Sequence, residues 1–468
     1  MNFASFPYLL FLVTVACIYF CMSKKYRHIF LLFSSYLFYS FFGFGFLALM
    51  IVTTIITFIT SYYCYYSDKA INKKLFFYLG LSLDLLIFIL FKYFHIINID
   101  IMNWPNWSVQ KLLIPIGISF YTFKTVGYCI DIYKRKYPPE SSFVYYALSV
   151  SFFPQLIAGP IEKSVVISAQ IKQNNAFNIQ NVIEGSKLIV WGLFKKIVIA
   201  DSIAQIINPV FNNIKLYNGL DLWITFIAFA YQVYVDFSGY SDIAIGSAKC
   251  FGVKLPANFN KPFFAKNVRE FWIRWHVSFS KWLKEYIFDS LGGISKTNQL
   301  KTAFNIFLLF LLVGFWHGAT INFIIYSQLA FAFMIIDIIS KDIRKIFFNA
   351  INIKSKSFTL KLISYITMVL MIAFLSVYFK LASISDSTYV FKHLLPLQFN
   401  NFNMYKVEYI LLYIIVFEFF QYFQITADGH CFQRVKSFYI RTIMYIIIIF
   451  SILLFSSRPD LTFQYFQF

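Results

Sequence analysis

The stretch that decides the fold is Phe315–Thr320 (FWHGAT), which lies inside the apolar run Ala303–Ile339. A polar side chain at membrane depth must find a partner or a cavity, because hydrocarbon offers it no water. His317 stands sixteen residues (317 − 301) beyond Lys301, which is about 24 Å along a continuous helix. His317 is therefore the first candidate for a functional residue.

The composition excludes a water-soluble globular protein. Of the 468 residues, 59% are hydrophobic and only 13% are charged, and the mean hydropathy is +0.65. Such a chain cannot cover an apolar core with a polar shell, so we predict an all-α polytopic membrane protein. The length suffices for roughly ten spans of about 20 residues, and we expect a single membrane domain over 1–468. The first run, Phe6–Met22, has no basic segment before it, so we expect a retained span and not a signal peptide.

Apolar runs predict the positions of the spans to within several residues. Besides the run around His317, they lie near 5–22, 29–45, 47–66, 75–97, 112–133, 143–158, 183–210, 222–247, 360–380, 407–424 and 441–456.

The formal charge of +20 indicates membrane topology and not a nucleic-acid partner, because the basic residues lie mainly in short loops between apolar runs. Lys24–Arg27 and Lys73–Lys74 lie two spans apart, whereas the loops around 42–46 and 97–110 carry almost no Lys or Arg. This asymmetry predicts that the N-terminus lies outside the cytoplasm.

The same rule predicts the side of the C-terminal tail. Arg434, Lys436 and Arg441 precede the final apolar run, which predicts that the tail 456–468 also lies outside the cytoplasm. With both termini on one side, we expect an even number of crossings.

The least hydrophobic long segment is 249–301, in which Lys and Arg alternate with Phe and Trp at helical spacing. It predicts cytoplasmic interfacial helices whose aromatic faces enter the headgroup region. His276 lies in this segment, and from the residues alone a structural histidine is as good an interpretation as a functional one. The other four histidines, at positions 28, 95, 393 and 430, receive no role. The six cysteines are scattered, so we expect neither a metal site nor a disulfide.

The surroundings of His317 suit acid–base chemistry. Gly314 and Gly318 flank it, and glycine allows a neighbouring backbone or a narrow substrate to approach closely. An imidazole shielded from water can remove a proton from a hydroxyl that attacks an acyl donor. The alternative is a structural histidine that is hydrogen-bonded to another helix.

Several motifs, taken in order, carry a resemblance. They are Phe153–Ile161 (FPQLIAGPI), Phe237–Asp242 (FSGYSD), Pro256–Phe263 (PANFNKPF), Arg269–His276 (REFWIRWH), Lys281–Tyr286 (KWLKEY) and Phe315–Ala319 (FWHGA). Together they resemble the membrane-bound O-acyltransferase (MBOAT) family, in its alginate and peptidoglycan O-acetyltransferase branch, to which the teichoic acid D-alanyl transferase is related.

The resemblance implies a ring of transmembrane helices around a central tunnel, in a bacterial inner membrane with both termini periplasmic. It implies His317 and His276 as catalytic residues, with His276 nearer the cytoplasmic mouth. It implies acetyl-coenzyme A as the donor substrate and no bound cofactor. We place the donor entrance in the basic segment, with Arg269, Arg274, Trp275, Lys284 and Trp316 as donor-binding residues. One departure is the stretch Ile294–Thr297, where the family usually has Asn-Arg, so donor contacts in that loop are not carried over.

The tail Phe463–Phe468 (FQYFQF) resembles the aromatic C-terminal signature of the same branch. Tyr465 would then carry the acyl group, because a phenyl ester is activated enough to pass the group onward. The alternative is an aromatic anchor at the membrane interface.

The resemblance implies transfer of acetyl across the membrane for O-acetylation of an envelope polysaccharide, with the 6-hydroxyl of N-acetylmuramic acid in peptidoglycan as the first choice. The alternatives are alginate or another exopolysaccharide, and D-alanyl transfer to teichoic acid. A transporter or lipid flippase would show paired broken helices in two halves, and the sequence has no such repeat. We expect a separate periplasmic SGNH-type O-acetyltransferase as partner, which binds the acceptor.

Overall fold

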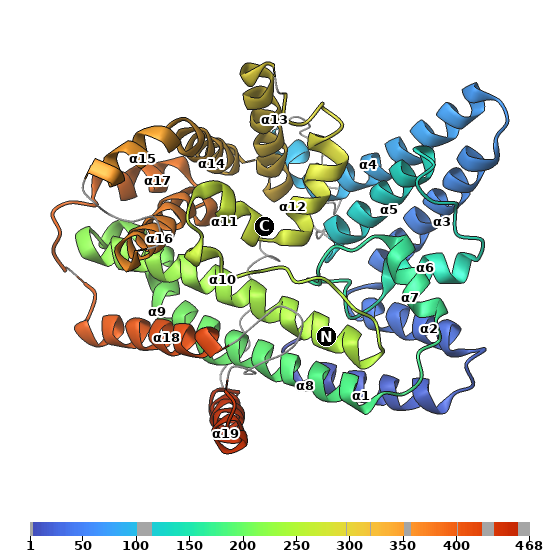
Figure 1. Ribbon diagram of the computed structural model, residues 1–468, viewed down its shortest axis with the longest axis horizontal. Helices are drawn as coiled ribbons and strands as arrows, with labels where there is room; N and C mark the ends of the chain where they lie inside the picture. Colours follow the sequence, from blue (N-terminus) through green and yellow to red (C-terminus); the bar gives the residue numbers. More distant parts are fainter. Residues whose placement is uncertain are drawn as a thin grey trace. The chain divides into compact units, whose positions relative to one another are not determined.

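The computed structural model describes residues 3–100, 115–295, 297–318, 320–350, 357–399, 401–423 and 435–456, without the side chains of 94–100 and 347–349 (Figure 1). Within these ranges every regular element is a helix and there is no strand. This confirms the predicted all-α class. Helices satisfy their own backbone hydrogen bonds, as a chain in lipid requires.

The chain forms two compact units. The first comprises Met1–Gly192 and Tyr240–Ala257, and the second comprises Leu193–Gly239 and Asn258–Phe468. The predicted single domain over 1–468 and the predicted ring of helices concern how these units are joined, and both stay predictions.

Among its described residues, the first unit contains eight helices and the end of a ninth. They are α1 (Phe6–Cys21), α2 (Arg27–Ser40), α3 (Phe44–Tyr66), α4 (Ala70–Asp100), α5 (Ile118–Tyr133), α6 (Phe143–Ser151), α7 (Ser164–Lys172), α8 (Ile179–Leu193) and the last part of α10 (Gly219–Cys250). In Figure 1, α3 and α4 run alongside each other, and both contact α5.

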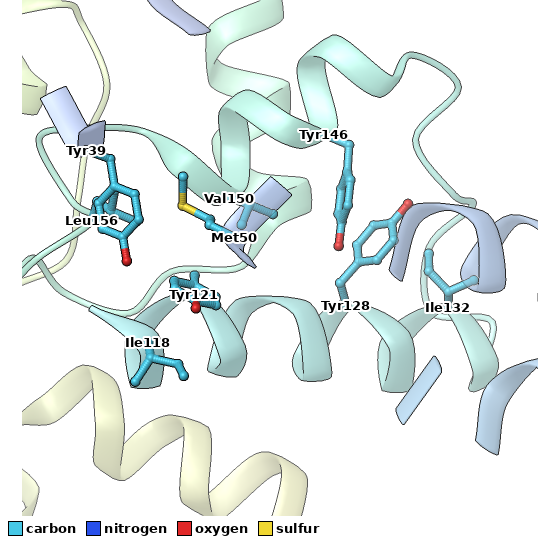
Figure 2. Packing of buried hydrophobic residues seen from close by; sticks show 9 residues of the cluster. All are labelled: Tyr39, Met50, Ile118, Tyr121, Tyr128, Ile132, Tyr146, Val150 and Leu156. Carbon is cyan, nitrogen blue, oxygen red and sulfur yellow. The ribbon is translucent and has the colours of Figure 1, made fainter. Parts of the chain in front are cut away.

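The core of the first unit is rich in tyrosine. Figure 2 shows its buried cluster, which consists of Tyr39, Met50, Ile118, Tyr121, Tyr128, Ile132, Tyr146, Val150 and Leu156. The rings of Tyr128 on α5 and Tyr146 on α6 face each other, with centroids 4.4 Å apart. Gly117, just before α5, allows the backbone of Leu156 to approach closely, because its φ of 78° is left-handed and a Cβ there would lie 2.8 Å from the Leu156 carbonyl oxygen.

The second unit holds the candidate site. Its helices are π-helix η2 (Phe194–Ala200), α9 (Asp201–Asn212), η3 (Ile214–Leu216), the first part of α10, η4 (Pro262–Phe264), α11 (Val268–Arg274), α12 (Val277–Leu283), π-helix η5 (Lys284–Phe288), α13 (Gln299–His317), α14 (Ile321–Ile339), α15 (Lys341–Ala350), α16 (Phe358–Lys380), α17 (Ile384–Lys392), α18 (Met404–Phe423) and α19 (Phe438–Phe455).

A buried network of ion pairs stabilises the start of the second unit. The Lys196 Nζ atom lies 2.6 Å from Asp201 Oδ1 and 3.0 Å from Asp236 Oδ1, although Lys196 lies within an apolar run. Loss of one partner from such a network leaves a buried charge uncompensated, at a cost of about 3–5 kcal/mol. The apolar pattern of the run did not reveal this network.

Seven helices in the described ranges are long and apolar enough to cross a membrane, namely α3, α4 over Ala70–Tyr93, α10, α13, α14, α16 and α19. The structure corrects one expectation and adds one detail. The run near 143–158 forms only the nine-residue α6, about 13 Å long and too short to span the bilayer alone. The run 303–339 is broken after His317 into α13 and α14. The sides on which the termini lie stay predictions.

Candidate active site

His317 is the last residue of α13, at a sharp change in chain direction. Gly318 caps the C-terminus of α13, and its N–H donates to the carbonyl of Gly314 at 3.2 Å. Helix α14 begins at Ile321. Helix α14 then packs against α13 (Figure 1). His317 is 6% exposed, so the break places a buried imidazole beside the first turns of the following helix.

The two glycines beside His317 make this packing possible. A Cβ at Gly314 would collide with Ser327 Oγ and lie 2.9 Å from the carbonyl oxygen of Phe323. A Cβ at Gly318 would lie 2.8 Å from the ring of Phe323. The predicted close approach of a neighbouring backbone is thus confirmed for Gly314.

Gly314→Ala should therefore push α13 and α14 apart. Overpacking of a tight contact costs roughly 1–3 kcal/mol, and His317 would shift with the end of α13. We expect a lower unfolding temperature in detergent and reduced activity. Gly45→Ala is the matched control, because nothing lies within 4 Å of a Cβ at that position. Equal unfolding temperatures for the two variants would contradict this account of the packing.

Four aromatic rings surround the imidazole of His317. The ring centroids of Trp316, Phe379, Tyr326 and Phe323 lie 4.6, 5.1, 5.7 and 5.9 Å from the imidazole centroid. They come from α13, α14 and α16, so three helices together fix the orientation of the histidine. Aromatic walls also exclude water, which strengthens any electrostatic contact made there.

His276 lies in the turn between α11 and α12 with a left-handed backbone, φ 44° and ψ 54°. This conformation is uncommon for a residue other than glycine and is often found at functional sites. The side chain is 3% exposed, and neither ring nitrogen has a hydrogen-bond partner among the described residues. Burial lowers the pKa of His276 to about 3, so the imidazole is neutral at physiological pH.

The segment before α11 holds the His276 turn in place. The Val277 N–H donates to the carbonyl of Asn258 at 2.8 Å, and the Ser278 hydroxyl donates to the Asn258 side chain at 2.7 Å. In addition, the Asn260 N–H donates to the carbonyl of Arg274 at 3.0 Å. These bonds give the Pro256–Phe263 motif a structural role in positioning His276.

A cavity of about 800 Å³ connects the two histidines. It contains most of the predicted site residues, which are His276, His317, Arg269, Trp275, Lys284 and Trp316. Its lining residues on α13 run from Gln299 to His317, a distance of about 27 Å along the helix. The lining is mostly apolar, and the basic side chains of Arg269 and Lys284 are exposed.

Arg274 differs from the other predicted donor residues. It does not line this cavity, and its guanidinium lies 2.5 Å from the carboxylate of Glu270 on the same helix. Lys284 lines the cavity while pairing with Asp289 at 2.8 Å. Arg269 is thus the better placed arginine for a ligand in the cavity.

Tyr465 and the tail after Ser456 lie outside the described residues, so the acyl-carrier role of Tyr465 stays a prediction. In the described part of the chain, no group of three metal-binding side chains occurs, and the five cysteines found there are free.

The sequence interpretation missed the residues that complete the surroundings of His317. Tyr326 and Trp272 line the cavity, and Phe379 contacts the imidazole. The sequence contained one signal for Tyr326. Gly318 and Thr320 favour the end of one helix and the start of another, and the second helix can then pack back against α13. Nothing distinguishes Phe379 in a chain with 22% aromatic residues.

Fold and site define a multi-pass membrane protein with a histidine-lined internal cavity. The model of the membrane-bound O-acyltransferase family matches residues 137–379, which is slightly more than half of the chain. The protein belongs to this family, as its motifs predicted.

Three relatives show the range of the similarity. The peptidoglycan O-acetyltransferase of Helicobacter pylori is 38% identical over 285 residues, which cover 55% of this chain and 54% of the relative. A Pseudomonas aeruginosa protein named "Probable alginate O-acetylase AlgI" is 32% identical over 343 residues, covering 70% of this chain and 64% of that protein. The teichoic acid D-alanyltransferase of Bacillus subtilis is 31% identical over 237 residues, covering 48% and 58%. The chain thus spans between half and two thirds of each of these relatives.

Proposed function

We propose that this protein is an O-acetyltransferase of the bacterial inner membrane, which takes acetyl from cytoplasmic acetyl-coenzyme A and moves it across the membrane to an envelope polysaccharide. The observation that carries the proposal is the single cavity that joins the exposed basic side chains of Arg269 and Lys284 to the enclosed His317. Family membership and the names of the relatives supply the reaction class.

In the proposed reaction, His317 acts as the general base. It removes the proton of an attacking hydroxyl, and the oxygen bonds to the thioester carbonyl carbon. The C–S bond then breaks, and the imidazolium returns the proton to the leaving thiolate. The products are an acetyl ester and free coenzyme A, and the histidine is neutral again.

Peptidoglycan is the proposed acceptor, at the 6-hydroxyl of N-acetylmuramic acid. One relative with 38% identity is named for this polymer, while a relative named as a probable alginate O-acetylase is also 38% identical and another matches a larger share of the chain. An SGNH-type periplasmic transferase is the proposed partner that binds the acceptor. Alginate or another exopolysaccharide is the alternative acceptor, and D-alanyl transfer to teichoic acid is the alternative reaction, which a further relative supports.

The identity of the acceptor can be tested by measuring the acetate that mild base releases from each purified polymer. Cells that express the protein with its partner should contain base-labile acetate in peptidoglycan, and cells without it should lack this acetate. Acetate found only in exopolysaccharide would contradict the choice of polymer but not the chemistry. Base-labile D-alanine in its place would contradict the acetyl donor.

The exposed basic side chains should attract the anionic donor. Arg269→Ala should weaken the affinity for acetyl-coenzyme A by about 1 kcal/mol, roughly fivefold, because an exposed charge pair contributes about that much. The loss should shrink as salt rises, since salt screens exposed charges. Equilibrium binding on the purified protein measures both. Arg274→Ala is the comparison, and we expect a smaller loss because Glu270 already pairs with Arg274. If the affinity for acetyl-coenzyme A depended neither on salt nor on Arg269, the basic segment would serve only to set the membrane topology.

A further inference from the structure

Among the four rings that surround His317, Tyr326 stands out by its hydroxyl group. Phe323 and Phe379 carry no polar atom, whereas Tyr326 places a phenol 5.7 Å from the imidazole, measured between ring centroids. The interplanar angle is 85°, so the two rings meet edge to face. Phe323 and Tyr326 stand three residues apart on α14, on one face of the helix that packs against the end of α13.

Tyr326 is one of the residues that line the cavity, as is His317. The rings of Tyr326 and His317 contact each other, and both contact the ring of Phe379. The phenol and the imidazole therefore belong to the same part of the cavity wall.

Acyl transfer creates a need for such a donor. When a hydroxyl adds to a thioester, the electron pair of the C=O bond moves to oxygen, and the tetrahedral intermediate carries a negative charge there. In an apolar, water-excluding site a fixed hydrogen-bond donor stabilises this charge far more than water-exposed donors do. The base His317 takes up the proton at the same moment, so base and donor must both lie close to the reacting carbonyl group.

We propose that Tyr326 is a catalytic residue that donates a hydrogen bond to the oxyanion of the thioester intermediate. The proposal rests on the proposed acetyl transfer. Addition of the acceptor hydroxyl forms the C–O bond while His317 holds the proton, and the Tyr326 O–H donates to the former carbonyl oxygen. Collapse restores the C=O bond and breaks the C–S bond, and the thiolate takes the proton from His317. Tyr326 keeps its own proton throughout.

The variant Tyr326→Phe tests the proposal, because it keeps the aromatic ring and removes only the hydroxyl. With the purified full-length protein, acetyl-coenzyme A as probe and water as the attacking hydroxyl, thiol release should show a kcat about 10²- to 10³-fold below wild type, as for other oxyanion donors. The KM for the donor should stay within about twofold, because the hydrogen bond forms in the transition state. The unfolding temperature should match that of wild type.

Tyr378→Phe on α16 is the matched control. The ring of Tyr378 packs against Phe391 and does not line the cavity, so loss of its hydroxyl should leave kcat unchanged. A kcat of Tyr326→Phe within threefold of wild type would overturn the proposal and leave Tyr326 a packing residue. A higher KM with unchanged kcat would also overturn it. If wild-type protein released no thiol at all, the proposed function itself would fail, which is distinct from a loss in the variant alone.

Discussion

Cells that carry His317→Ala should contain no acetylated polymer while the protein remains at its normal level in the membrane. His317 lines the cavity and contacts the rings of Trp316, Phe379, Tyr326 and Phe323, and removal of a general base costs a factor of about 10² to 10⁴. Base-labile acetate in the purified polymer and immunoblots of the membrane fraction measure the two quantities.

The matched control is His28→Ala. His28 stacks on Tyr145 in the first unit and has no proposed role in the chemistry, so its removal should leave acetylation intact. Normal acetylation in the His317→Ala cells would show that His317 is a structural histidine.

Tyr465→Phe should also eliminate acetylated polymer, if the tail phenol relays the acetyl group outward. A soluble partner outside the membrane cannot reach an enclosed histidine, so a carrier must move between them. Tyr465 lies ten residues (465 − 455) beyond the end of α19 at Phe455, and at about 3.3 Å per extended residue this segment reaches roughly 33 Å. That length is comparable to the hydrocarbon thickness of a bilayer, about 30 Å, so the phenol can reach into the membrane.

The substitution separates the two interpretations of the tail, because phenylalanine preserves an aromatic anchor and removes the nucleophilic oxygen. An acetyl group on the C-terminal peptide of wild type, found by mass spectrometry, would support the relay. Wild-type amounts of acetylated polymer in Tyr465→Phe cells would exclude it and favour the anchor.

The sequence predicted the features that follow from hydropathy and from single residues. The all-helical class followed from the apolar runs, and His317 was recognisable as a polar residue deep in one of them. Gly314 was expected to admit a close neighbour, and a Cβ there would indeed meet α14. Local composition dictates such features, so a single sequence suffices.

Other features depend on contacts between distant segments. The run 303–339 has no charged residue near its centre to mark the break after His317, and only that break brings Tyr326 back to the imidazole. Likewise, the sequence around Lys196 does not show that this lysine forms an ion pair with Asp236, which lies forty residues later in the chain. Arg274 was predicted as a donor contact by its charge, while its pairing with Glu270 depends on the α11 geometry.

The most direct measurement uses the purified protein in liposomes with acetyl-coenzyme A that carries a labelled acetyl group. The account predicts that wild-type protein releases one thiol for each labelled acetyl that leaves the donor, and that His317→Ala protein, equally folded, releases neither. Equal thiol release by both proteins would contradict the claim that this cavity and its histidine perform the transfer.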